Sequence, residues 1–200
     1  MSSQAPRAAP AELLAAFAEV AQNNHWRWYV FGAQAVVAYG RPRMTADVDV
    51  AVDAGGRTNV ELVDVLRAAG FGTRMDLDAA FLSSARLLPM VHHATAMPVD
   101  VVVVQPGLQE EFLERSRAVD VGGVLVPVIS PEDLIASKIL AARRKDLEDV
   151  RGVLLERWES LDFEQLEAVV TRLDEVLGSQ RLRARLRRLV RQAKKLLEIT

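Results

Sequence analysis

The 200-residue chain contains no cysteine. Disulfide bonds, thiolate zinc sites and a cysteine nucleophile are therefore excluded, and a reducing cytoplasm is the expected compartment. No apolar run approaches the ~20 residues that a membrane-spanning helix needs, so we expect no membrane partner. The first residues lack a basic segment followed by an apolar one, so no signal peptide is expected.

Half of the residues are hydrophobic and 26% are charged, which is the composition of a globular protein with a substantial core. The net charge of -2 indicates no partner, but the charge is unevenly distributed. Residues 179–200 hold eight Lys or Arg and one Glu, a net charge of +7, so the other 178 residues carry -9. An acidic body with a basic tail suggests that a polyanion is a partner.

Hydrophobic periodicity predicts an α/β (α+β) fold, with a mixed sheet flanked by helices and a helical C-terminal region. Helices are expected over residues 11–23, 33–39, 57–69, 108–117, 131–158, 163–177 and 180–198. Strands are expected over 28–31, 47–52 and 98–104, with a hairpin around Gly122-Gly123. Residues 71–97 give no clear pattern. The order predicts two domains, a core over 1–130 and a helical region over 131–200.

Two acidic residues interrupt an apolar strand in the stretch TADVDVAV. Asp47 and Asp49 are two residues apart, so on a strand both side chains leave the same face, about 6.6 Å apart. Asp100 lies among valines in a later predicted strand. If the two strands pair, three carboxylates converge, and they stay ionised together only beside cations. The alternative is that Asp47 and Asp49 form a strand end or a salt-bridged surface pair.

Carboxylate oxygens suit Mg²⁺, and two such ions ~3.5–4 Å apart clamp the attacking and leaving oxygens of a phosphoryl transfer. Gly32 supports this reading because it follows a predicted strand and begins a short helix. Helix N-termini bind phosphate through free backbone N–H groups. Asp47 comes fifteen residues later, so a phosphate cradle and an acidic strand are neighbours along the chain.

The stretch FGAQAVVAYGRPRMTADVDVAV resembles the signature of the polymerase-β-like nucleotidyltransferase superfamily. In that superfamily a G-[GS] turn and a helix precede an alternating acidic pair, and a third carboxylate lies on a later strand. The stretch SPEDLIASKILAARRKDLEDV is similar to the small bacterial branch that includes the abortive-infection toxins. The resemblance covers about residues 29 to 150. One departure is Ala33, which stands where the family has Gly or Ser.

The resemblance implies transfer of a nucleoside monophosphate from an NTP to a hydroxyl, with release of pyrophosphate. It implies catalytic and metal-binding roles for Asp47, Asp49 and Asp100, which would hold two Mg²⁺ ions, with Mn²⁺ as the alternative metal. The expected nucleotide-binding residues are Gly32, Ala33, Gln34, Arg43 and Lys138. For Arg43 the alternative is a solvated loop residue.

The basic tail has a heptad-like apolar stripe, which predicts a packed terminal helix. The stripe consists of Leu182, Leu186, Leu189, Ala193 and Leu196. The arginines occupy the remaining faces. They form a solvated surface, a binding surface for RNA, or a surface that docks on an acidic protein or a second copy.

Three functions remain open on the sequence alone. The first is a metal-dependent nucleotidyltransferase that acts on tRNA or another RNA, as the toxin of a toxin–antitoxin pair with an antitoxin protein as partner. The second keeps the chemistry and changes the acceptor to a small hydroxylated molecule of the antibiotic type. The third is a non-catalytic nucleotide-binding or RNA-binding relative.

Overall fold

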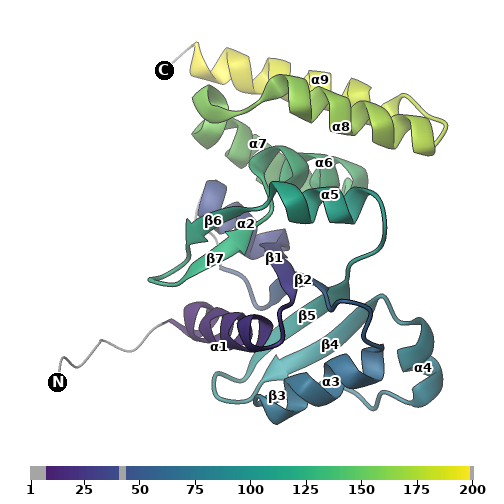
Figure 1. Ribbon diagram of the computed structural model, residues 1–200. Coiled ribbons are helices and arrows are strands. Elements are labelled where there is room, and N and C mark those ends of the chain that lie inside the picture. The colour runs from purple at the N-terminus through teal and green to yellow at the C-terminus, as the bar shows by residue number, and fades with distance from the viewer. Residues whose placement is uncertain (1–7, 41–43, 199–200) are drawn as a thin grey trace. The chain divides into compact units, whose positions relative to one another are not determined.

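The computed structural model describes residues 8–40 and 44–198, and it confirms the predicted α/β class (Figure 1). The chain divides into two compact units. Unit 1 comprises the described residues up to 34 and residues 44–129, and unit 2 comprises residues 35–40 and the described residues from 130 on. The assignment of separate roles to domains 1–130 and 131–200 stays a prediction.

Unit 1 contains a seven-stranded mixed sheet within the described residues, in the order β3-β4-β5-β2-β1-β7-β6. The strands are β1 (Arg27–Phe31), β2 (Val48–Asp53), β3 (Phe71–Thr73), β4 (Leu87–His92), β5 (Met97–Val103), β6 (Arg117–Asp120) and β7 (Leu125–Val128). The hairpin expected around Gly122-Gly123 is confirmed as β6 and β7. At the centre, β2 pairs antiparallel with β1 and parallel with β5. β2 and β5 therefore present their polar side chains beside one another.

The helices of unit 1 cover an aromatic and aliphatic core. They are α1 (Ala9–Asn23), α3 (Asn59–Ala68), α4 (Ala79–Ser84) and α5 (Leu108–Arg115). Phe17 of α1 packs against Trp28 and Phe71, with ring centroids 5.0 and 6.0 Å away. Burial of a phenylalanine side chain such as Phe17 or Phe71 stabilises the folded state by roughly 1.5–3 kcal/mol. The segment 71–97, which had no clear pattern, forms β3, α4 and β4.

Helix α2 (Gly32–Tyr39) begins in unit 1, directly after β1. Unit 2 otherwise consists of α6 (Pro131–Ala141), α7 (Arg144–Arg157), the 3-10 turn η1 (Trp158–Ser160), α8 (Phe163–Val176) and α9 (Arg181–Leu197). No helix in the described part of the chain is both long and apolar enough to cross a membrane.

The prediction of a single helix over 131–158 is wrong, because the helix is interrupted at Ala142. This residue adopts a left-handed conformation with φ 56°. Its backbone N–H donates to the Lys138 carbonyl and closes α6. The Asp146 carboxylate then accepts from the backbone N–H of Arg143 at 3.2 Å and caps the start of α7.

Helices α8 and α9 pack through an apolar stripe and a buried aspartate. Leu182, Leu186, Leu189 and Ala193 are buried as predicted, but Leu196 is 51% exposed because it lies in the last turn of α9. Asp174 of α8 is fully buried. Burial raises the pKa of Asp174, but hydrogen bonds from Arg183, Ser179 and Leu182 outweigh it, so the pKa lies below its usual value. These bonds fix the start of α9.

Candidate active site

The centre of the sheet brings two predicted site residues into register. β2 and β5 are parallel neighbours, and Asp49 pairs with Asp100 in their register. Both side chains are half-buried, between buried residues on each strand. Because residues in register on adjacent strands point to the same face, the two carboxylates share that face. Asp47, which was predicted to begin the strand, lies one residue before β2 and two residues from Asp49.

The pKa of Asp100 is shifted by burial and by two neighbouring charged residues, one of which is Asp47. Burial raises the pKa of Asp100 above the usual carboxyl value, the Arg74 guanidinium opposes this rise, and the Asp47 carboxylate adds to it. A like charge acts in this way only at short range. The Asp47 and Asp100 carboxylates therefore interact within unit 1.

Gly32 lies against Asp49 at the junction of β1 and α2. The register pairs Phe31 with Asp49, so the next residue, Gly32, passes beside the Asp49 side chain. Its φ is 63°, a conformation that favours glycine, and a Cβ there would overlap the Asp49 carboxylate. Two features therefore require glycine at position 32: the left-handed backbone conformation and the Asp49 carboxylate where a Cβ would lie.

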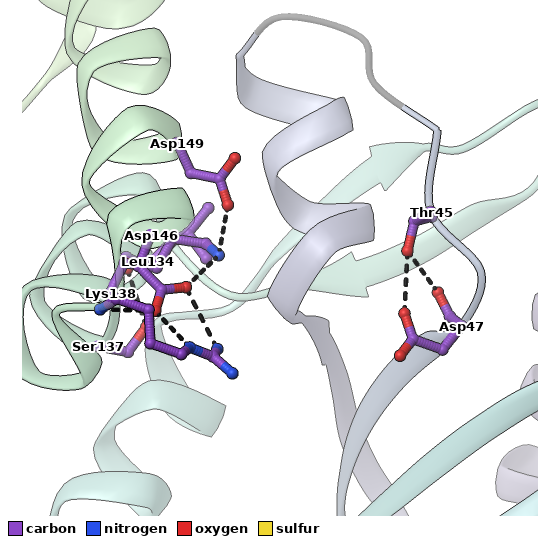
Figure 2. A network of polar contacts seen from close by, with 8 residues as sticks. Thr45, Asp47, Leu134, Ser137, Lys138, Asp146 and Asp149 are labelled. Carbon is purple, nitrogen blue, oxygen red and sulfur yellow. Dashed lines mark hydrogen bonds and ion pairs between the residues drawn. The ribbon is translucent and has the colours of Figure 1, made fainter.

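Thr45 and Arg74 are residues that sequence reasoning missed. The Thr45 hydroxyl lies 3.0 Å from both Oδ1 and the backbone carbonyl of Asp47, as Figure 2 shows, and donates to one of them. Arg74 follows β3 and forms an ion pair with the Asp100 carboxylate. Its backbone N–H donates to the Pro89 carbonyl at 2.9 Å, and Pro89 is the residue opposite Asp100 on β4. The strand pairing therefore places Arg74 beside Asp100.

The three carboxylates fit a divalent cation in kind, because hard ions such as Mg²⁺ take oxygen ligands. Within residues 8–40 and 44–198, however, no three His, Cys, Asp or Glu side chains are grouped closely enough to hold a metal ion. Two of the carboxylates have other partners, since Asp100 pairs with Arg74 and Asp47 with Thr45. The metal-binding role of the trio stays a prediction.

Two of the predicted nucleotide-binding residues are buried at the start of α2. Ala33 is 7% exposed and Gln34 is 4% exposed. The first N–H groups of any helix lack carbonyl partners within it, so this end of α2 offers donors from the backbone. Arg43 lies outside the described residues. The nucleotide-binding roles of these residues stay predictions.

Lys138 belongs to unit 2, in a buried ion cluster that joins α6 and α7. Its Nζ lies 2.8 Å from Oδ2 of Asp149 and 3.4 Å from Oδ1 of Asp146, a network that Figure 2 shows. Burial raises the pKa of Asp146, but the Arg143 hydrogen bond and the Lys138 charge outweigh it, so the pKa is lowered. Lys138 thus has a structural role, and its contact with a nucleotide stays a prediction.

A family model described as "Nucleotidyltransferase of unknown function (DUF6036)" matches residues 11–198. The chain belongs to this family. The predicted membership in a nucleotidyltransferase family is thereby confirmed. The acidic strands β2 and β5 lie within the matched residues.

Several solved structures share the fold of this chain. ANT(2'')-Ia, solved in complex with adenylyl-2''-tobramycin, has a TM-score of 0.60 and 18% identity, over 85% of this chain and 99% of that chain. An antigenic nucleotidyltransferase-like protein from Paracoccidioides brasiliensis has a TM-score of 0.55 and 17% identity, over 86% and 90%. JHP933 from Helicobacter pylori has a TM-score of 0.50 and 12% identity, over 98% and 97%. No curated protein matches the chain in sequence.

Proposed function

We propose that unit 1 transfers a nucleoside monophosphate from an NTP to a hydroxyl acceptor and releases pyrophosphate. The observation that carries the proposal is the pairing of Asp49 and Asp100 in register on parallel strands, with Gly32 against the Asp49 carboxylate. In a nucleotidyltransferase, this arrangement supports a site where carboxylates and the start of a helix act on the same triphosphate.

The proposed roles follow from chemistry. Asp47, Asp49 and Asp100 would hold Mg²⁺ or Mn²⁺, which when bound neutralises the phosphate oxygens. The N–H groups from Gly32 to Gln34 hold the β- and γ-phosphates, with Arg43 and Lys138 as further candidates. The acceptor oxygen attacks the α-phosphorus, the bond between that phosphorus and the β-phosphate oxygen breaks, and the hydroxyl proton passes to Asp100. Positioning and charge neutralisation supply the catalysis.

The acceptor that we propose is RNA, with tRNA as the leading candidate. The support is the basic helix α9, which gives an otherwise acidic chain one surface suited to a polyanion. We further propose that the chain acts as the toxin of a toxin–antitoxin pair, with an antitoxin protein as its partner.

A small hydroxylated molecule is the second candidate acceptor. The fold that the chain shares with ANT(2'')-Ia, whose complex contains adenylyl-2''-tobramycin, favours it. Label on an aminoglycoside or a lincosamide, with none on RNA, would select this acceptor.

The experiment incubates the protein with each labelled NTP, Mg²⁺ and total tRNA. We expect label on RNA, and we expect Asp49→Asn to lower its incorporation by at least roughly 10²-fold because the oxygen that binds cation is replaced by an amide. Asp53→Asn is the matched control, since Asp53 ends the same strand and pairs with Arg27 at 3.5 Å. Equal labelling by wild type and Asp49→Asn would reject the site, and the absence of any labelled product would favour a non-catalytic relative.

A further inference from the structure

Helix α9 presents four arginines along one face. Arg181, Arg185, Arg188 and Arg191 follow one another at steps of four, three and three residues, so they lie in a row on the helix surface. With Ala184 they line a hollow of about 450 Å³. We call this row the arginine face. It lies away from the leucines of α9 that are buried in unit 2.

Three of the four other cations of α9 have carboxylate partners within the protein. Arg183 pairs with Asp174 at 3.5 Å, Arg187 with Glu167 at 3.2 Å and Lys194 with Glu198 at 3.9 Å. The arginine face differs. Among the described residues no carboxylate forms an ion pair with its four members, and Arg185 donates to a backbone carbonyl, that of Ile139. Like charges three or four residues apart destabilise a helix, and the bond to Ile139 accounts for Arg185 alone.

We propose that the arginine face binds the phosphodiester backbone of RNA. Guanidinium groups match phosphate oxygens in pairs, and a rise of 1.5 Å per residue makes the row about 15 Å long, enough for several successive phosphates. The face contains no aromatic side chain on which a base could stack. It has no large apolar residue either, so it lacks the apolar core that is typical of a protein–protein interface. RNA therefore binds through its backbone and without regard to sequence.

The test measures binding of a fluorescent single-stranded RNA by anisotropy, without NTP or divalent metal, between about 50 and 200 mM salt. For four phosphate contacts, a plot of the logarithm of the binding constant against the logarithm of the salt concentration is expected to have a slope of about -3. Arg181→Ala combined with Arg188→Ala lowers the affinity at low salt by roughly tenfold or more and reduces the slope by about 1.4. An RNA of shuffled sequence binds equally.

Arg187→Ala is the matched control, because its ion pair with Glu167 gives it a partner inside the protein. It leaves the salt slope unchanged. Equal binding by wild type and by the double variant, with unchanged circular dichroism, would overturn the proposal, as would preference for polyglutamate over RNA. Asp49→Asn separates this proposal from nucleotidyl transfer, since it keeps RNA binding whether or not the chain is an enzyme.

Discussion

Gly32 is the residue on which the position of the Asp49 carboxylate depends. Its left-handed backbone and its lack of a Cβ let β1 pass directly into α2 beside that carboxylate. The first property is common to several glycines of the chain. The second matters most at Gly32, because the side chain that a Cβ there would meet, Asp49, belongs to the proposed site.

Gly32→Ala is therefore expected to lose both stability and activity. The left-handed conformation costs alanine roughly 1–2 kcal/mol, and the new methyl group displaces the Asp49 carboxylate. Gly55→Ala is the control, since Gly55 has φ 64° and a Cβ there would meet nothing within 4 Å. Thermal unfolding and NTP transfer measure the two effects. Loss of transfer in both variants alike would refute a specific role for Gly32.

Arg74 neutralises Asp100 in the structure, and a divalent cation would compete with it for the same carboxylate. We expect Arg74→Ala to bind Mn²⁺ roughly tenfold more tightly, because a positive charge leaves the neighbourhood of the carboxylates. Calorimetric titration with Mn²⁺ measures this without any turnover. Arg27→Ala, which breaks the exposed pair with Asp53, leaves the affinity unchanged. Weaker Mn²⁺ binding by Arg74→Ala would show that the arginine supports the site rather than competes for it.

At the scale of elements, the junction of α6 and α7 is held by charge. Helix α6 ends at Ala141, a residue with a high helix propensity, and α7 begins three residues later at Arg144. The buried ammonium of Lys138 joins carboxylates of the second helix to the first. The ion cluster thus accounts for a break that local propensity opposes.

Lys138→Met tests this cluster by leaving Asp146 and Asp149 buried without their shared cation. Removal of one partner of a buried ion pair costs about 3–5 kcal/mol, which we expect to appear as a lower urea midpoint. Lys145→Met, on the exposed surface of α7, changes stability by less than about 0.5 kcal/mol. If both variants unfold at the same midpoint, Lys138 is free for another role, such as the predicted contact with a nucleotide.

At the scale of the whole molecule, the proposed catalytic carboxylates and the basic helix lie in different parts of the chain. The carboxylates of the proposed site belong to unit 1, and the arginine face belongs to unit 2. The last 22 residues carry +7, against -9 on the rest. RNA association is thus expected to depend on α9 and on salt, and transfer on the carboxylates of the sheet.

Several elements could be predicted because their signals are local. The alternation of Asp and Val predicted β2, and a run of valines around the single charge of Asp100 predicted β5. Ser130, Pro131 and Asp133 predicted the start of α6. The break at Ala142 could not be predicted, because alanine favours a helix and the cluster that opposes it involves residues on both sides. Arg74 was missed because its partner Asp100 is 26 residues away, across two strands of the sheet.

By itself, the sequence determined the fold class, the family and which acidic residues were candidates, since periodicity and motif spacing are properties of neighbouring residues. Only the tertiary structure decided that Asp49 and Asp100 stand in register, that Arg74 pairs with Asp100, and which arginines of α9 have carboxylate partners. The physical reason is that these contacts join segments far apart in the chain, and their geometry depends on how strands and helices pack.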